Sequence, residues 1–241
     1  MNGLPNLEFK IVYDNHPFTK GLKTGWGFSC LILGPQKTIL FDTGADGKTL
    51  IHNLNALGFS PADIDTVFLS HIHKDHTGGL DVLLQHKPGL SVWLPDSFPD
   101  DFKNTVAQSG GHCHSVTGPE ILCPGVHTTG VIEGWIHEQS LFLESLPGIV
   151  LITGCAHPRI VRILSEVRRQ SGRQIYLVMG GFHLAGFEKS EIRSILSFFE
   201  DAGVKKAGPA HCTGDDASKL FKEAFQNHYL DIGAGRSVKI P

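Results

Sequence analysis

Three histidines and an aspartate fall within six residues of this chain, in the run His71-Ile72-His73-Lys74-Asp75-His76. The run directly follows the apolar segment 66–69, and Thr77-Gly78-Gly79 comes after it. Residues two apart lie on the same side of an extended chain, so His71 and His73 can hold one metal ion. Asp75 and His76 come after the turn and can reach a second ion beside it. This spacing at the end of a strand predicts a metal centre rather than a loop of surface histidines.

Other metal-competent residues repeat the arrangement of an apolar strand, small residues and then a polar side chain. They are Asp42 after 38–41, His157 after 149–152, His183 after 175–179 and His211 after 204–207. In a layered α/β protein the ends of the strands are where sites assemble. We therefore expect these side chains to converge on the histidine-rich run.

Short apolar runs rich in β-branched residues predict strands, and segments with a helical period predict helices. The predicted strands are 9–13, 28–33, 38–41, 66–69, 91–94, 140–143, 149–152 and 175–179. The predicted helices are 48–57, 160–169, 190–202 and 215–225, with a short helical turn at Ser60-Pro61. This order is typical of the α/β or α+β class. We expect a single domain, 1–241, with an irregular insertion at about 95–134 that contains one helical piece near 101–109.

Composition argues against several classes of function. The formal net charge is −3, so we expect no nucleic-acid partner and no anionic membrane surface. Apolar runs stop far short of about 18 residues, and the first 14 residues lack the pattern of a signal peptide, which favours a cytoplasmic protein. The five cysteines have no repeated spacing and are expected to be free thiols. Cys155 and Cys212 flank site histidines, and we expect them to be packing residues, with a nucleophile or a soft metal ligand as the alternatives.

Taken together, the histidine-rich run, the preceding Asp42-Thr43-Gly44 and the later His157 and His211 resemble the metallo-β-lactamase superfamily. Finer motifs resemble the branch named for 7,8-dihydropterin-6-methyl-4-(β-D-ribofuranosyl)-aminobenzene-5′-phosphate synthase. They include Phe41-Asp42-Thr43-Gly44, Gly154-Cys155-Ala156-His157-Pro158, Gly180-Gly181-Phe182-His183-Leu184 and His211-Cys212-Thr213-Gly214. The resemblance runs from about residue 27 to the C-terminus. Kinship of fold does not by itself fix the substrate.

This resemblance implies a four-layer αββα sandwich with a dinuclear site at one edge. It implies that His71, His73 and His157 hold the first metal and that Asp75, His76 and His211 hold the second. Asp42 is then expected to orient a ligating imidazole. The superfamily often carries a bridging Asp, whereas the matching strand end here reads Gly180-Gly181-Phe182-His183, without an acid. The second site is therefore expected to be weaker or bridged only by water. For His183 we expect substrate binding or proton transfer, with a structural role as the alternative.

Imidazole and carboxylate ligands suit two Zn²⁺ ions, with Fe²⁺ or Mn²⁺ as alternatives. Two metals about 3.5–4 Å apart would lower the pKa of a shared water from about 15.7 to around 7, and the hydroxide would attack an ester, phosphoester, lactone or amide. Asp75 would orient that hydroxide. We expect a metal-dependent hydrolase with a small-molecule substrate. The alternatives are a metal-dependent transferase of the pterin type and a non-catalytic protein that binds a metabolite.

Three residues near the strand ends are candidates for substrate contact: Phe182, His183 and Arg159. Arg159 follows His157-Pro158 at the start of a predicted helix, where it could pair with a phosphate or carboxylate or be a solvated helix-start residue. Phe182, Trp26 and Trp135 could stack on a flat ring, although core packing is the expected role for each ring taken singly. His112 and His114 follow Gly110-Gly111, and we expect a polar loop there rather than accessory ligands.

Overall fold

The computed structural model describes residues 3–241, in which the strands form two mixed sheets. The first sheet has the order β13-β1-β2-β3-β4-β5-β6, and the second has the order β12-β11-β10-β9-β8-β7. Strands of the first sheet are β1 (Leu7–Tyr13), β2 (Ser29–Leu33), β3 (Thr38–Phe41), β4 (Thr66–Phe68), β5 (Ser91–Pro95), β6 (His112–Val116) and β13 (Ser237–Ile240). Those of the second are β7 (Glu120–Cys123), β8 (Val126–Thr128), β9 (Leu141–Ser145), β10 (Gly148–Thr153), β11 (Ile175–Gly181) and β12 (Lys206–Ala210).

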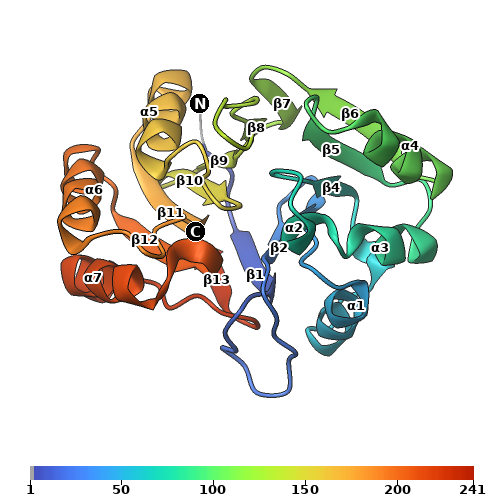
Figure 1. The fold of residues 1–241 in the computed structure, drawn as a ribbon, viewed down its shortest axis with the longest axis horizontal. Coiled ribbons are helices and arrows are strands. Elements are labelled where there is room, and N and C mark those ends of the chain that lie inside the picture. Colours follow the sequence, from blue (N-terminus) through green and yellow to red (C-terminus); the bar gives the residue numbers. More distant parts are fainter. Residues whose placement is uncertain (1–2) are drawn as a thin grey trace.

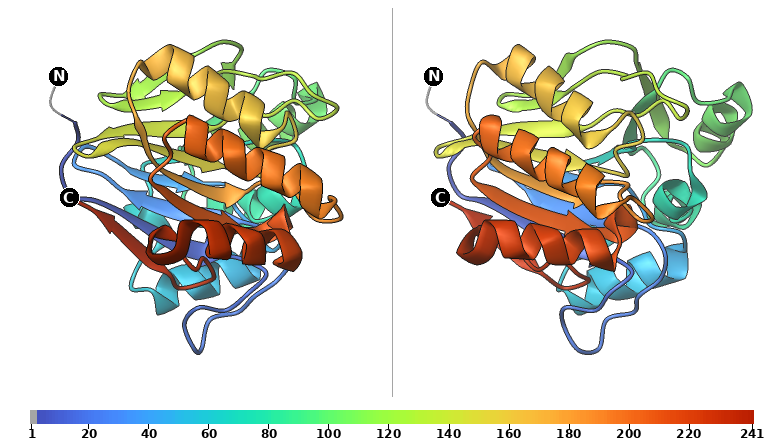
Figure 2. Two further views of the ribbon diagram at one scale, coloured as in Figure 1. Left: turned by 90° about the vertical axis from the view of Figure 1, so that its left-hand side faces the viewer. Right: turned by 60° about the vertical axis from the view of Figure 1, so that its left-hand side comes forward.

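Helices cover the outer face of each sheet. Those beside the first sheet are α1 (Gly47–Ala56), α2 (Lys74–Thr77), α3 (Leu80–His86) and α4 (Asp100–Gln108). Those beside the second are α5 (Ile160–Ser171), α6 (Lys189–Asp201) and α7 (Asp215–Phe225). Short 3₁₀ turns are η1 (Pro61–Asp63), η2 (His211–Thr213) and η3 (Gln226–His228). Figure 1 shows α5, α6 and α7 on one side of the sheets and α1, α3 and α4 on the other, and Figure 2 shows the same layers from two further directions.

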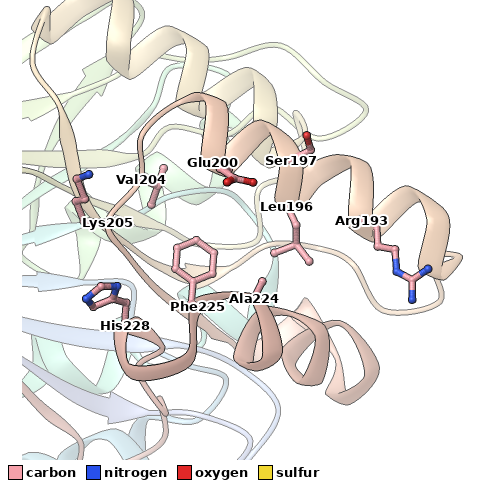
Figure 3. A pocket seen from close by; sticks show the side chains of 9 residues that line it. All are labelled: Arg193, Leu196, Ser197, Glu200, Val204, Lys205, Ala224, Phe225 and His228. Atoms are coloured by element: carbon pink, nitrogen blue, oxygen red, sulfur yellow. The ribbon is translucent and has the colours of Figure 1, made fainter.

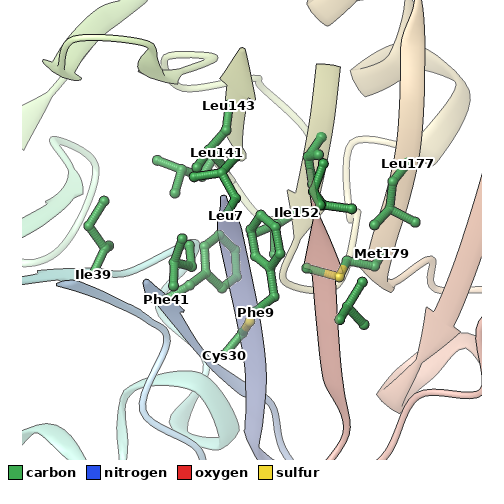
Figure 4. Packing of buried hydrophobic residues seen from close by; sticks show 14 of the residues in the cluster. Leu7, Phe9, Cys30, Ile39, Phe41, Leu141, Leu143, Ile152, Leu177 and Met179 are labelled. Atoms are coloured by element: carbon green, nitrogen blue, oxygen red, sulfur yellow. The ribbon is translucent and has the colours of Figure 1, made fainter. Parts of the chain in front are cut away.

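Three apolar clusters hold these layers together. Phe9 and Phe41 of the first sheet meet Leu141, Ile152 and Met179 of the second in the central cluster (Figure 4). A second cluster joins the first sheet to α1 and α3, and a third joins the second sheet to α5, α6 and α7. Burying the two faces of each sheet in this way supplies the main driving force for folding. The structure confirms the mixed α/β class and the αββα sandwich predicted from the resemblance.

Parallel pairing brings the site-bearing strand ends together. β3 pairs with β4 in parallel, and β10, β11 and β12 pair with one another in parallel. Parallel neighbours finish at the same edge of a sheet, so residues that follow these strands share one edge of the sandwich. Asp42, His71, Cys155, His183 and His211 all come within three residues of the end of such a strand.

The segment 95–134 differs from the irregular insertion that the sequence predicts. It contains α4 at the predicted place, and it also contains β6, β7 and β8. β6 and β7 are the outermost strands of their sheets at this side of the molecule. Such edge strands pack against one neighbour only, and the β6 sequence His112-Cys113-His114 has mostly solvent-facing side chains. An edge strand with so few apolar residues lacks the pattern by which strands are recognised.

Two further elements were not predicted from the sequence. Helix α3 buries Leu80, Leu83 and Leu84 against the first sheet, directly after the glycine pair. Strand β13 extends the same sheet by pairing with β1 in antiparallel register. In the part of the chain that the structure describes, no helix combines the length and the apolar character that a membrane crossing requires.

Candidate metal centre

Three imidazole nitrogens form a compact triangle at the end of β4 and β10. His71 Nε2 lies 3.2 Å from His73 Nδ1, His157 Nε2 lies 3.2 Å from His73 Nδ1, and the His71 and His157 Nε2 atoms are 3.3 Å apart. Zinc binds histidine nitrogen at about 2.0–2.1 Å with tetrahedral geometry, which puts ligand nitrogens about 3.3–3.4 Å apart. The triangle therefore matches three corners of a zinc tetrahedron and leaves the fourth corner free.

A second triangle lies beside the first. The Nε2 atoms of His76 and His211 are 3.2 Å apart, and Asp75 Oδ2 lies 3.2 Å from His211 Nε2 and 3.6 Å from His76 Nε2. The rings of His71 and His76 have centroids 4.2 Å apart, so the two triangles are neighbours. The structure thus brings together all six residues that the resemblance assigns to two metals, in the same two sets of three.

Asp42 orients imidazoles of both triangles. Its Oδ2 accepts a hydrogen bond from the Ser70 hydroxyl at 2.7 Å and lies 2.7 Å from His76 Nδ1, while its Oδ1 accepts from the Ser70 backbone N–H at 2.7 Å. Ser70 Oγ in turn lies 2.9 Å from His71 Nδ1. A carboxylate that holds the Nδ1 proton leaves the Nε2 lone pair free for a metal. Asp42 therefore makes the contact with a candidate ligand imidazole that we expected, and its effect on metal binding stays a prediction.

Two residues that the sequence did not point to hold other parts of the site. Asn15 Nδ2 donates to the His211 carbonyl oxygen at 3.1 Å, and Asn15 Oδ1 lies 3.0 Å from His211 Nδ1. The fully buried carboxylate of Glu138 accepts backbone hydrogen bonds from Cys155, Ala156 and His157 at 2.9–3.0 Å. Glu138 thereby fixes the loop that presents His157. Neither residue belongs to a local motif, because its partners lie far away in the sequence.

Protonation favours metal binding at this centre. Burial lowers the pKa of His71 well below its usual range, and burial together with the neighbouring His183 and His73 lowers the pKa of His157 to about 3. Burial raises the pKa of Asp75, but the hydrogen bond from His211 and the charge of His76 outweigh it and bring that pKa to about 2. His71 and His157 are therefore neutral imidazoles and Asp75 is an ionised carboxylate, the forms that bind metal. At His76 burial lowers the pKa, but the charges of Asp42 and Asp75 outweigh that effect and raise it.

Backbone strain is concentrated in the same place. Asp42, Ala156, Arg159, His183 and His211 all have a positive φ, between 49° and 79°. Such a conformation costs non-glycine residues about 1–3 kcal/mol each, and it persists only where the surrounding structure imposes it. This clustering is typical of a functional site.

The residues predicted to contact substrate lie in different surroundings. His183 is half-buried, with its ring centroid 4.5 Å from that of His157, so it lies at the metal centre. The hydrogen bond with Cys212 raises the pKa of His183. Phe182 is 1% exposed and packs against Phe199 and Phe221, and it is also among the residues that line the groove beside His183.

Arg159 is exposed beside the site, at the N-terminal end of α5. Its guanidinium carbon lies 4.9 Å from the centre of the Phe187 ring. Arg159, His183 and Phe187 line a groove of about 670 Å³ whose wall is mainly apolar. A separate cavity of about 530 Å³ between α6 and α7 contains none of the candidate metal ligands (Figure 3). The groove next to His183 is therefore the better placed of the two to receive a substrate.

Two tryptophans flank the centre, contrary to the expected core packing. Trp135 is 69% exposed, and its ring centroid is 4.8 Å from that of His157. Trp26 is 60% exposed, with its ring centroid 4.9 Å from that of His211. Both rings lie in loops that carry no periodic pattern, which is why the sequence could not distinguish these rings from core residues.

The fold and this arrangement of ligands define a class of protein, and sequence comparison agrees with it. The model of the metallo-beta-lactamase superfamily matches residues 26–157, and the chain belongs to this superfamily. A curated relative is the 7,8-dihydropterin-6-methyl-4-(beta-D-ribofuranosyl)-aminobenzene-5'-phosphate synthase of Methanocaldococcus jannaschii. It is 28% identical over 254 aligned positions, covering 86% of this chain and 85% of the relative.

Solved structures share the whole architecture. Tm1679, described as a metal-dependent hydrolase of the beta-lactamase superfamily, has a TM-score of 0.82 and 25% identity, covering 97% of this chain and 99% of that one. A diphosphatase from the PhnP family has a TM-score of 0.67 at 12% identity, covering 98% of each chain, which shows the common fold alone. The superfamily usually binds metals, and the described residues provide candidate groups of histidine, cysteine and aspartate for them.

Proposed function

We propose that this protein is a metal-dependent hydrolase that cleaves an ester, phosphoester or lactone bond in a small molecule. The observation that carries the proposal is the triangle of His71, His73 and His157, which leaves one corner of a tetrahedron for water or substrate. Three protein ligands with an open position are typical of catalytic zinc, whereas structural zinc is enclosed by four.

The donor set favours zinc at both positions. When bound, a pair of such ions lowers the pKa of water and polarises an oxygen of the substrate. Histidine nitrogens supply most of the ligands, and zinc accepts nitrogen and carboxylate oxygen together. Fe²⁺ and Mn²⁺ use similar donors and are the alternatives to test.

Asp75 and His183 carry the proposed chemistry of the chain itself. The Asp75 carboxylate stays ionised, with its pKa lowered to about 2, so one of its oxygens can accept a hydrogen bond from the attacking water. The His183 imidazole lies beside that of His157, with the ring centroids 4.5 Å apart, and is placed to hold an oxygen of the substrate or of its leaving group. Trp135 and Trp26 flank the opening and limit the access of water to it.

The groove next to His183 is the proposed place for the rest of the substrate. Its wall includes Leu184, Phe187 and Ile195, which suit an apolar group. Arg159 stands at this groove, and no carboxylate within residues 3–241 pairs with its guanidinium. An unpaired guanidinium at a mainly apolar groove favours a substrate with an anionic end.

A second candidate function is group transfer on a pterin-type substrate. It is favoured by the similarity to the Methanocaldococcus jannaschii synthase, which extends over most of both chains. The same ligands would then activate a phosphate-bearing substrate for attack by a group other than water. The two functions differ in the origin of the oxygen or group that enters the product.

The test is a substrate panel with zinc-loaded protein in water enriched in heavy oxygen. The panel contains a phosphodiester, an acyl lactone, a carboxylic ester and a pterin phosphate, with metal-stripped protein and His73→Ala as controls. The hydrolase predicts metal-dependent turnover with heavy oxygen in the product. Metal-dependent turnover without heavy oxygen would support the transferase instead. The absence of turnover, with substrate binding retained, would favour a non-catalytic binding protein.

A further inference from the structure

Two buried thiols lie inside the metal centre and have no part in the ligand set described above. Cys155 follows β10 and is 3% exposed, and Cys212 lies in η2 and is 6% exposed. Cys155 Sγ is 3.2 Å from His76 Nε2. The Cys212 thiol donates to the Cys155 carbonyl oxygen at 3.6 Å. Their burial alone is consistent with packing, so what surrounds each sulfur decides between packing and metal binding.

Cys155 is the most central of the metal-competent side chains among the described residues. Its sulfur forms one group with His71 and His76, another with His211 and Cys212, and a third with His157 and His183, with ligand atoms in each group within 4.8 Å of one another. No other residue in the described part of the chain belongs to three such groups. The sulfur therefore borders both triangles of ligands.

The end of β11 leaves no room for an acidic side chain beside these two cysteines. This strand end has Gly180-Gly181 where many members of the superfamily carry a bridging acid. A Cβ atom at Gly181 would clash with the Gly154 carbonyl oxygen, and it would lie 2.7 Å from Cys212 Sγ and 3.1 Å from Cys155 Cα. Real Cβ atoms essentially never come within 3.0 Å of another heavy atom. The backbone of Gly154 and Cys155 and the Cys212 sulfur thus occupy the space that an acidic side chain at Gly181 would need.

The charge of two bound metal ions favours a further anionic ligand at the candidate metal centre. Two divalent ions bring four positive charges, whereas among the six candidate ligands only Asp75 is negative, and Asp42 adds one more carboxylate through its contact with His76. Uncompensated charge in a buried site is costly unless further anionic groups are close. A thiol that coordinates such an ion loses its proton outright and supplies that negative charge.

We propose that Cys155 is a sulfur ligand of the metal held by Asp75, His76 and His211, and that its negative charge takes the place of the missing acidic residue at that metal. Binding exchanges the S–H bond for a metal–sulfur bond and releases one proton to solvent, with no change of oxidation state. Tetrahedral zinc puts sulfur and nitrogen ligands about 3.5 Å apart, close to the 3.2 Å between Cys155 and His76. The inference depends on the proposed function only in requiring the metal centre.

The assignment gives the two metals different coordination and therefore different roles. With Cys155 added to Asp75, His76 and His211, the proposal gives this metal four protein donors, the number that encloses a tetrahedral metal. The triangle of three histidines then keeps the open corner for substrate. A thiolate also favours zinc over Mn²⁺, since manganese prefers oxygen donors.

The first test uses the unsubstituted zinc protein and X-ray absorption at the zinc edge. The proposal predicts a shell of sulfur at about 2.3 Å in addition to nitrogen and oxygen at about 2.0–2.1 Å. A spectrum fitted by nitrogen and oxygen alone would overturn the inference while leaving the proposed hydrolase intact. If no metal binds at all, both the inference and the proposed function fail. This measurement does not depend on whether a cysteine variant folds.

The second test identifies which sulfur is the ligand. In cobalt-loaded protein, a thiolate ligand gives a strong charge-transfer band in the near ultraviolet. We expect Cys155→Ser to lose the band, and Cys212→Ser and the surface control Cys113→Ser to keep it. Loss of the band in Cys212→Ser with retention in Cys155→Ser would refute the assignment. Iodoacetamide labelling of the unsubstituted protein should also become slower at Cys155 when zinc is added, but not at Cys113.

Discussion

Replacing Asp42 with asparagine should weaken metal binding without removing any metal ligand. The Asp42 carboxylate is completely buried and lies 2.7 Å from His76 Nδ1. It accepts the proton on that nitrogen, so the lone pair of His76 Nε2 faces Asp75 and His211. Asparagine has nearly the same shape but offers an NH₂ group in place of one oxygen.

The structure predicts the direction and the size of the effect. If the amide oxygen of the introduced asparagine stays with the Ser70 N–H, its NH₂ group faces the Nδ1–H of His76, and two donors oppose each other. His76 then carries its proton on Nε2, where it blocks the metal. Losing a hydrogen bond to a charged group costs about 1.5–3 kcal/mol, or about 10–150-fold in affinity. Removal of partners that orient metal ligands typically costs about 10–100-fold.

The assay is a zinc titration against a competing chelator, with Asp81→Asn on the exposed face of α3 as the matched control. We expect Asp42→Asn to weaken the metal at the Asp75–His76–His211 position most. The three-histidine position should weaken less, because Asp42 reaches His71 only through the Ser70 hydroxyl. Unchanged affinity at both positions in a folded Asp42→Asn protein would refute this reasoning.

The same geometry makes three further predictions. Glu138→Gln leaves one backbone donor of the 155–157 loop unpaired, so we expect a loss of about 1–3 kcal/mol and a melting temperature lower by roughly 2–12 °C, with little change in Glu133→Gln. The pKa of His157 is about 3 in the folded protein, far below its ordinary value of about 6.5 in the unfolded chain. As the pH falls below about 6.5 the unfolded chain therefore binds a proton that the folded protein does not, and metal-free protein should lose stability. Denaturant titrations at about pH 7.5 and about pH 5 should show a smaller pH dependence in His157→Gln than in the unsubstituted protein, and an equal dependence would contradict the prediction. Arg159→Gly removes strain at a φ of 79°, so we expect it to gain up to about 2 kcal/mol of stability while raising KM for an anionic substrate; lower stability or an unchanged KM would count against this role.

The local part of the site could be predicted from the sequence because its residues are neighbours along the chain. His71, His73, Asp75 and His76 come from one strand end and the turn after it, and chain geometry restricts where they can point. His157 and His211 could also be predicted, because each follows an apolar strand and small residues. The αββα arrangement was predicted from the resemblance to the superfamily. The order of strands and helices by itself predicted only the α/β or α+β fold class.

The supporting residues could not be predicted for the opposite reason. Asn15 contacts His211 across 196 positions of the chain, and Glu138 reaches a loop that begins 17 residues later. Nothing in the sequence near either residue differs from an ordinary loop. Strand β6 was missed because an edge strand needs few apolar residues, and β7 was missed because it is only four residues long.

The number of metal ions per chain tests the central claim most directly. Purified protein loaded with zinc and freed of excess metal should contain close to two ions per chain by plasma mass spectrometry. His76→Ala removes one ligand from the second triangle and none from the first, so it should retain close to one. Two ions in both proteins, or no more than trace metal in the unsubstituted protein after zinc loading, would contradict the account of two neighbouring sites.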